Sequence, residues 1–493
     1  MTNSRGGSGV RRFLKVSAIY ALGDALTKSA RIILVPYYLA AMSPGEVGQV
    51  AILQAIIMAT WALLSLGTGF GVRRFYVDDQ PNPDAMVTAI WWVRWLMALP
   101  LFIAVMGCGW LLAQRFQDLS WTLVALAIIA GTLKAGTNVI EAWFVIREEP
   151  MRYRTFTFLQ FLTSTLLIIV CVSVLKLGVL GAVLGELASY VIFTGVSAWL
   201  LHRTAQPDFR IVPWRKFLAY CLPMVPHFFF MWGLTAADRI VLKFFVSLAE
   251  VGVYDVGYLL ASFLTIFLLA MRSAWTPQYF RDAKESAEHA GFARTTDLFL
   301  FVIFGAALAG GLFAPEGISL LVKPSYEEAI SVFRVAVFGI AISGIFVALN
   351  QPLLFSGRTG LISWISGTGL LINLLVNVVL IPQMGIIGAA WATVVSYCCI
   401  SLALGVIIPT QFGIRWNWGY GLWLTLVSGA LLATGSQLLA NGTVMGVFWK
   451  LFLLLVFCVL SLIRFHRQPS GGWKVVVHEF WRSSLGKAHT FSV

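Results

Sequence analysis

Charged side chains interrupt an apolar stretch of the sequence over residues 234–258. Asp238, Arg239 and Lys243 precede a predicted turn, and Asp255 follows it. A charged side chain at the centre of a bilayer costs roughly 2.5–3.5 kcal/mol on insertion scales. If this stretch is a pair of membrane-spanning helices, its charges must point into a protected polar interior. There they could bind a charged substrate or a coupling ion.

Other apolar stretches carry charges with helical spacing. Asp24, Lys28 and Arg31 are spaced i, i+4 and i+7, which places them on one helical face. Lys134 and Glu141 share a face in the same way. Further charges occur singly (Arg94, Glu186, Arg334 and Lys450). Basic residues outnumber acidic ones in these stretches, so the predicted interior is cationic and suited to an anionic substrate.

Two roles follow from these residue types. Guanidinium and ammonium groups bind phosphate and carboxylate oxygens, so the candidate substrate-binding residues are the basic ones (Lys28, Arg31, Arg94, Lys134, Arg239, Lys243 and Arg334). Acidic residues at membrane depth can take up H⁺ or Na⁺, so the candidate coupling residues are Asp24, Glu141, Asp238 and Asp255. The alternative for each is a structural ion pair between helices, and this is our interpretation of Lys450 and Glu186.

The composition indicates a membrane protein. The 493-residue chain is 59% hydrophobic and 12% charged, and its mean hydropathy is +0.84, whereas soluble domains carry about 25% charged residues. The formal net charge of +13 reflects basic connections between apolar runs, so we expect membrane orientation and no nucleic-acid partner. No nucleophile-elbow, P-loop, zinc or paired-cysteine motif occurs. We therefore expect no enzyme, no metal and no bound cofactor.

The apolar runs predict an all-α integral membrane fold with about fourteen transmembrane helices. The expected spans are residues 16–41, 47–70, 88–112, 120–145, 157–175, 179–201, 217–246, 251–272, 295–314, 327–350, 360–381, 386–408, 418–438 and 445–464. Most Lys and Arg residues fall in the connections on the N-terminal side, whereas the other side carries only Arg115, Lys176 and Lys323. Both ends of the chain are therefore predicted to be cytoplasmic.

An internal repeat predicts two lobes. The segment LGVLGAVLGELASY at 177–190 aligns without gaps on MGIIGAAWATVVSY at 384–397, and Glu-Val-Gly at 46–48 recurs at 250–252. Six spans separate the copies, so the halves share one orientation, as in lobes related by a two-fold axis along the membrane normal. Chance similarity of Gly- and Ala-rich helices is the alternative.

The expected organisation has four parts. They are a first six-helix lobe over residues 1–207, a second over 208–408, two extra helices over 409–464 and a basic cytoplasmic tail over 465–493.

Four segments resemble helix signatures of bacterial polysaccharide-precursor flippases, in the multidrug/oligosaccharidyl-lipid/polysaccharide exporter superfamily. They are ADRIVLKFFVSLAEVGVYDVGY at 237–258, the LGTG…RRF stretch at 66–75, WTP at 275–277 and NLLVNVVLIPQMGIIGAAWAT at 373–393. The resemblance covers most of the chain, to about residue 464.

This resemblance implies an activity. A protein of this kind would move an undecaprenyl-diphosphate-linked oligosaccharide from the cytoplasmic to the periplasmic leaflet of the bacterial inner membrane by alternating access. Its partners would be membrane lipids, a polysaccharide polymerase and a co-polymerase. A role for Arg31 and Arg239 as diphosphate contacts is an inference from their positions.

Three alternatives stay open. A multidrug and toxin extrusion antiporter would favour cationic drugs, and hence acidic cavities. A lipid II flippase would share the cationic cavity and the fourteen spans. A membrane glycosyltransferase or polymerase would carry catalytic carboxylates on a long extramembrane loop, and the expected outer loops are short.

Overall fold

The computed structural model describes residues 33–77, 81–285, 291–356, 358–438 and 444–466. In this part of the chain all regular structure is helical and no strand occurs. It contains 11 stretches long and apolar enough to cross a membrane. The prediction of an all-α integral membrane protein is confirmed. The count of fourteen spans and the two symmetric six-helix lobes stay predictions.

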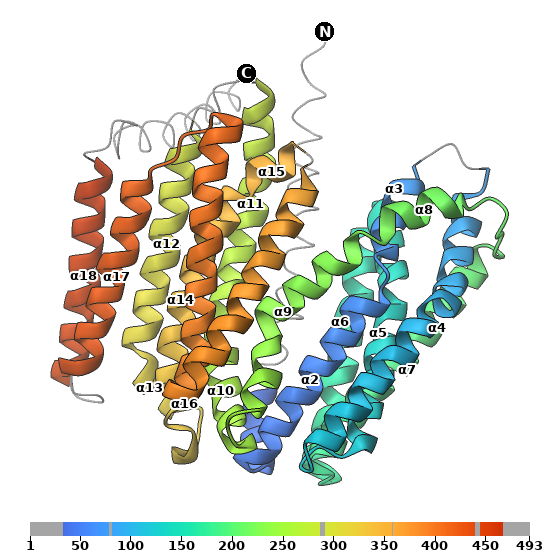
Figure 1. Ribbon diagram of the computed structural model, residues 1–493, viewed down its shortest axis with the longest axis horizontal. Helices are drawn as coiled ribbons and strands as arrows, with labels where there is room; N and C mark the ends of the chain where they lie inside the picture. The colour runs from blue at the N-terminus through green and yellow to red at the C-terminus, as the bar shows by residue number, and fades with distance from the viewer. Residues whose placement is uncertain (1–32, 78–80, 286–290, 357, 439–443, 467–493) are drawn as a thin grey trace, which may run out of the picture.

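The helices form two groups, with α9 crossing between them (Figure 1). The first group comprises α2 (Pro44–Leu64), α3 (Thr68–Phe75), α4 (Pro83–Arg115), α5 (Trp121–Ile146), α6 (Pro150–Ile169), the π-helical η1 (Val170–Val174), α7 (Gly178–Thr204) and α8 (Trp214–Cys221). The connecting helix α9 is Met224–Lys243.

The second group is coloured from light green to red in Figure 1. It comprises α10 (Leu248–Ala261), α11 (Phe263–Glu285), α12 (Phe292–Leu312), α13 (Ala314–Ser319), the 3₁₀ turn η2 (Pro324–Tyr326), α14 (Ala329–Leu349), α15 (Gln351–Phe355), α16 (Thr359–Phe412), α17 (Trp418–Leu438) and α18 (Val444–His466).

Two paired glycines of the sequence repeat share a positive φ. Gly178, at the start of α7, has a φ of 56°, and Gly385, its partner in the repeat, has a φ of 57°. A positive φ costs an L-residue with a side chain roughly 1–2 kcal/mol, whereas glycine adopts it freely. The 54-residue α16 is kinked at Gly385, where the backbone is not helical. The parts before and after this kink correspond to two of the expected spans, 360–381 and 386–408.

Two helices with identical caps bring the groups together. Ser43 starts α2 and Ser247 starts α10, and each forms a capping box with the glutamate three residues later. One turn further on, a Cβ atom on Gly48 would lie 1.9 Å from the Leu248 carbonyl oxygen. Conversely, a Cβ atom on Gly252 would lie 2.1 Å from the oxygen of Pro44. The two backbones therefore touch through a reciprocal pair of glycines, as elements related by a two-fold axis do.

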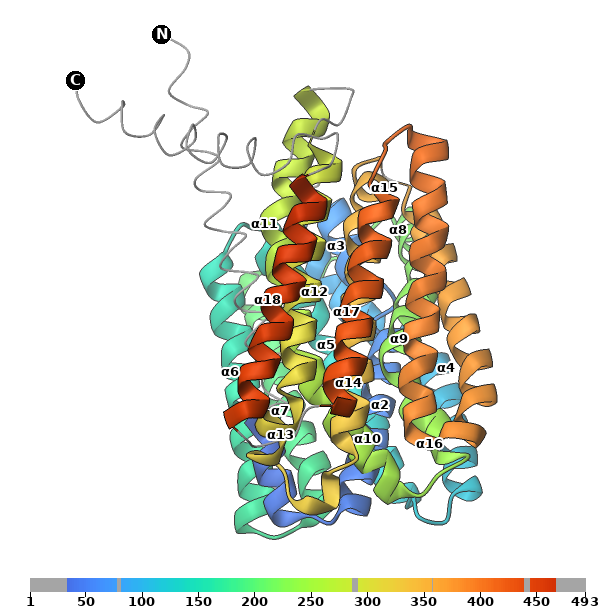
Figure 2. The ribbon, with the colours of Figure 1, turned by 90° about the vertical axis from the view of Figure 1, so that its left-hand side faces the viewer.

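A buried ion pair attaches the last helix. Lys450 of α18 is fully buried, and its Nζ lies 2.5 Å from Oε1 of Glu316 in α13. Phe457 of the same helix stacks on Phe301 of α12, with ring centroids 5.8 Å apart. Figure 2 shows α17 and α18 on the outer side of the second group. The structural interpretation of Lys450 agrees with this geometry.

We expect Gly48→Ala to lower the thermal stability of the purified protein, because the added methyl group must displace the backbone of α10. Overpacking of this kind typically costs about 1–3 kcal/mol. The matched control is Gly45→Ala in the first turn of the same helix, where a Cβ atom would meet nothing within 4 Å. Equal melting temperatures of the two variants in detergent would show that the α2–α10 contact is looser than described.

Candidate functional site

A cluster of charges lies where α9 meets α10. Arg239 is 6% exposed, and its Nη1 donates hydrogen bonds to Oδ1 of Asp238 at 3.1 Å and to the Thr235 carbonyl at 3.0 Å. Its Nε donates to Oδ1 of Asp255 at 3.0 Å. The Tyr254 hydroxyl donates to the other oxygen of Asp238. Asp238 and Asp255 therefore both form ion pairs with the Arg239 guanidinium.

Two tyrosine rings flank this guanidinium. The Arg239 Cζ lies 4.4 Å from the ring centroid of Tyr258 and 5.3 Å from that of Tyr254. Such contacts with the face of a ring attract a cation, the more so where water is excluded. The cluster contains one more carboxylate than guanidinium, so it holds Arg239 firmly and is not itself an open cationic surface.

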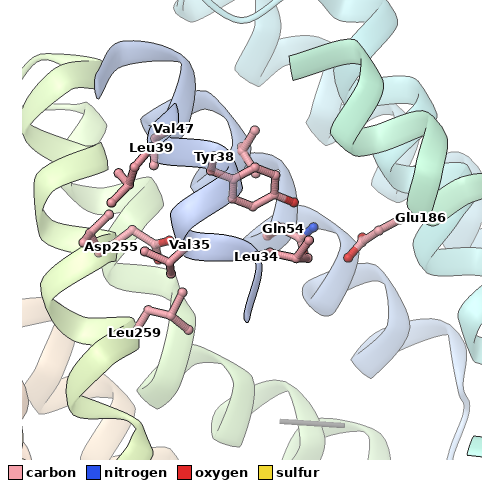
Figure 3. Close-up of a pocket in the computed structure, with 11 residues that line it drawn as sticks. Leu34, Val35, Tyr38, Leu39, Val47, Gln54, Glu186, Asp255 and Leu259 are labelled. Carbon is pink, nitrogen blue, oxygen red and sulfur yellow. The ribbon is translucent and has the colours of Figure 1, made fainter. Parts of the chain in front are cut away.

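A cavity of about 40 Å³ adjoins the cluster between residues 33–41, α2, α7 and α10. Its polar lining consists of Tyr38, Gln54, Glu186 and Asp255. Figure 3 shows the Gln54 and Glu186 side chains turned towards each other, with Asp255 on the opposite side of the cavity. Because one water needs roughly 10–15 Å³, the cavity has room for a few waters. A sugar or a diphosphate requires a wider state.

Lys134 of α5 lies inside the first group. Its Nζ is 3.3 Å from the Met58 sulfur, and it lies 5.6 Å from the ring centroid of Trp61 and 5.5 Å from that of Tyr190. Met58 and Trp61 follow Gln54 on α2 by one and two helical turns, so they share its face. The Lys134 ammonium group therefore lies along the same face of α2 as Gln54, which lines the cavity. The rings of Trp61 and Tyr190 are its aromatic neighbours.

Lys243 lies at the end of the molecule where α2 and α10 begin. Its Nζ forms an ion pair with Oδ2 of Asp118 at 2.7 Å, and the Asp118 side chain is 57% exposed. Gln49 of α2 donates to the Asp118 carbonyl at 2.7 Å. Phe116 and Phe244 meet edge to face, with centroids 4.8 Å apart. These contacts join the loop after α4 to α2 and α9, so Lys243 fastens the two groups at this end.

Two further arginines bind the ends of helices. Nη1 of Arg94, a side chain only 1% exposed, donates to the carbonyl of Leu64, the last residue of α2. Nε of Arg334 donates to the Gly311 carbonyl, near the end of α12. The last carbonyls of a helix lack intrahelical partners and carry partial negative charge. Both arginines therefore satisfy helix C-termini and lie apart from the Arg239 cluster.

The remaining predicted residues divide into two sets. Asp24, Lys28 and Arg31 lie outside the described residues. Glu141 accepts a hydrogen bond from the Thr137 hydroxyl on its own helix at 3.1 Å. The structure thus brings Asp238, Arg239 and Asp255 together, and it places the other described candidates in separate surroundings.

The sequence interpretation missed Gln54, Tyr254 and Asp118. Gln54 is a polar residue within the apolar run of α2, and this pattern in the sequence could have marked it as a candidate. Tyr254 lies one residue before Asp255 and reaches Asp238 only because α9 and α10 pack side by side. Asp118 is 125 residues from Lys243, and nothing in the local sequence connects the two.

A polar network stabilises the opposite end of the first group. Asp84, at the start of α4, accepts hydrogen bonds from Tyr76, from the indole of Trp143 and from Arg147, each at 2.8 Å. Burial, together with the Asp84 carboxylate, raises the pKa of Tyr76 to about 12. The tyrosine therefore remains a donor at physiological pH. Asp84 is therefore the common acceptor of this network.

The fold and the buried charges define a multi-pass membrane protein. The sequence profile of the family described as "polysaccharide biosynthesis protein" matches residues 13–281, more than half of the chain, and the chain belongs to this family. A curated relative, the probable flippase AglR of Haloferax volcanii, is 30% identical over 186 residues. That match covers 35% of this chain and 37% of AglR, so the chain spans little more than a third of that relative.

Solved structures share the fold at low sequence identity. A lipid II flippase, MurJ, in an inward closed conformation has a TM-score of 0.67 at 14% identity, covering 90% of this chain and 100% of MurJ. A MOP superfamily transporter from Pyrococcus furiosus has a TM-score of 0.61 at 13% identity, covering 86% of this chain and 97% of that one. A MATE protein in complex with MaD3S has a TM-score of 0.59 at 14% identity, covering 86% and 96%. The chain therefore has the fold of MOP superfamily transporters.

We expect Asp118→Asn and Lys243→Met to lower the melting temperature non-additively, because each removes the same ion pair. The pair is half exposed, so the coupling should be at most about 1 kcal/mol and should fall as added salt screens it. A double-mutant cycle at low and high salt measures this coupling. Strictly additive effects at low salt would show that the pair does not fasten the two groups.

Proposed function

We propose that the chain is a flippase that moves an anionic, lipid-linked oligosaccharide from the cytoplasmic to the periplasmic leaflet of the bacterial inner membrane. The substrate we propose is an undecaprenyl-diphosphate-linked intermediate of surface polysaccharide biosynthesis. Membership of the polysaccharide biosynthesis family, the partial likeness to AglR and the transporter fold support this proposal. The lipid tail would stay in the bilayer while the sugars pass between the helix groups.

One observation connects the proposed substrate with particular residues of this chain. Two basic side chains lie beside aromatic rings: Lys134, half-buried within the first group, lies beside Trp61 and Tyr190, and the buried Arg239 lies between Tyr254 and Tyr258. Ammonium and guanidinium groups bind phosphates and sugar acids, and aromatic rings offer faces to sugar C–H groups.

The packing of the groups supports alternating access. The reciprocal glycine contact and the Lys243–Asp118 pair lie at the end where α2 and α10 begin, and the two groups diverge from that end (Figure 1). With both termini in the cytoplasm, as the positive-inside pattern predicts, the closed end faces the periplasm. Opening of this end would then expose the substrate to the outer leaflet.

Energy for the cycle would come from H⁺, from Na⁺ or from the membrane potential, without a bound cofactor. The acids proposed for coupling are Asp24, Glu141, Asp238 and Asp255. In addition to the lipid-linked substrate and the surrounding lipids, the proposed partners are a polysaccharide polymerase and its co-polymerase. The chain would act by transport and not by catalysis.

A second candidate function is the flipping of lipid II. The observation that favours it is the fold of MurJ, which this chain reproduces over the whole of MurJ's length. A multidrug extrusion antiporter is a weaker candidate, because the charges at membrane depth are predominantly basic. Both alternatives fall within the same superfamily, so a defined substrate must distinguish them.

We expect Lys134→Met and Arg239→Gln each to reduce flipping of a fluorescent undecaprenyl-diphosphate oligosaccharide in proteoliposomes at least tenfold. Each removes a charge-assisted contact, and 1.4 kcal/mol is tenfold in rate. The control is Lys323→Met, a basic residue in an exposed loop. Flipping of lipid II alone would favour the second candidate, and flipping of neither lipid would refute the proposal.

We expect Glu141→Gln to change the dependence of flipping on pH or Na⁺ if this acid takes up the coupling ion, because an amide cannot be protonated and binds Na⁺ more weakly. Flipping rates of the variant and of the unaltered protein, measured across imposed pH and Na⁺ gradients, test this expectation. A variant whose gradient dependence equals that of the unaltered protein excludes Glu141 from coupling.

A further inference from the structure

Among the residues that the structure describes, the hydrogen bonds of the Arg239 guanidinium involve two of its three nitrogens, Nη1 and Nε. Nη1 is occupied by the Asp238 carboxylate and the Thr235 carbonyl. Nε binds one oxygen of Asp255, whereas Nη2 makes no hydrogen bond within the described part of the chain. Nε and Nη2 form the edge through which arginine binds a carboxylate or phosphate with two parallel hydrogen bonds. Asp255 therefore occupies half of a two-point anion-binding edge.

The two carboxylates on this guanidinium differ in their surroundings. Asp238 is 1% exposed and also accepts the Tyr254 hydroxyl, so its removal would take from this buried hydroxyl its acceptor and leave Nη1 with the Thr235 carbonyl alone. The Asp255 side chain is 17% exposed and lines the cavity. A carboxylate beside a cavity that holds water can exchange a protein donor for a water donor at lower cost. Asp238 is thus the fixed partner of Arg239, and Asp255 is the exchangeable one.

We propose that Asp255 is an internal competitor for Arg239, which a phosphate group of the substrate displaces from the Nε–Nη2 edge while Asp238 retains Nη1. This inference rests on the proposed function, since it assigns a residue contact to the headgroup of that substrate. The displaced carboxylate turns into the cavity between α2, α7 and α10. The ligand class is the diphosphate of a polyprenyl lipid, the group that joins the polyprenyl chain to the oligosaccharide in the proposed substrate.

The exchange connects binding to the separation of the helix groups. In the described state the cavity has a volume of about 40 Å³, which is too small for a diphosphate. Its walls come from both groups, with Gln54 on α2 and Asp255 on α10. A headgroup can reach Arg239 only when these walls move apart, and Asp255 occupies the guanidinium until that happens. The carboxylate thereby keeps a buried cation paired in the absence of substrate.

The test measures affinity for defined anions with the full chain in lipid nanodiscs. The probes are undecaprenyl diphosphate, undecaprenyl monophosphate and inorganic pyrophosphate. Asp255→Asn should bind undecaprenyl diphosphate about tenfold more tightly than the unaltered protein, because a charged competitor is replaced by a neutral amide. Asp255→Ser carries the same expectation and replaces the first variant if that one is not recovered folded.

The matched control is Asp238→Asn, the same substitution on the other carboxylate of the same guanidinium. It should bind the diphosphate no more tightly than the unaltered protein, because Asp238 positions Arg239 and does not compete with the ligand. Arg239→Gln should remove the gain in affinity when combined with Asp255→Asn. A merely structural role of Asp255 would weaken binding or leave it unchanged.

Several results would overturn the inference. They are unchanged or weaker binding by both Asp255 variants, an equal gain in Asp238→Asn, or a gain that survives Arg239→Gln. A gain for inorganic pyrophosphate without a gain for undecaprenyl diphosphate would show that the site takes free phosphate and not a lipid headgroup. Flipping by the unaltered protein without an Asp255 effect refutes this inference alone. Tighter diphosphate binding by Asp255→Asn without any flipping refutes the proposed function and leaves the exchange standing.

Discussion

A charge within a bilayer must find its partner inside the protein, and this constraint determines where the buried charges of this chain lie. Lipid offers no hydrogen bonds, so an unsatisfied polar group there costs several kcal/mol. Arg94 meets the end of α2, and Lys450 meets Glu316. Arg239 is held by two aspartates. The same requirement that makes these residues costly in lipid makes each of them a fixed point of the fold.

The reciprocal approach of α2 and α10 decides how the two helix groups meet. Gly48 and Gly252 let the backbones touch, and close packing of this kind is one source of attraction between helices in a membrane, where no hydrophobic force drives them together. The contact lies at one end, and it is supported there by Lys243 and Asp118. The proposed alternating access would require this well-packed interface to open and close.

The proposed transport site uses the same elements. The cavity and the Arg239 cluster lie along α10 beyond the glycine contact, so a movement that separates α10 from α2 also changes the cavity. Asp255 is the side chain that belongs to both, because it lines the cavity and binds Arg239. In the proposed mechanism, charge recognition and helix separation would be linked through this one carboxylate, a local electrostatic event of the type that biases a two-state protein.

The sequence by itself determined the class of fold, because apolar runs of about 20 residues can satisfy their backbones in lipid only as helices. It also determined the repeat, whose paired glycines at 178 and 385 share a positive φ, and the presence of charges around 238–255. Helical spacing shows which residues share a face, but not what that face meets. Only the tertiary structure decided that Arg239 is shared by two aspartates, that Lys243 reaches Asp118 and that Arg94 caps a helix. Each of these contacts depends on how separate helices pack, and several link residues far apart in the chain.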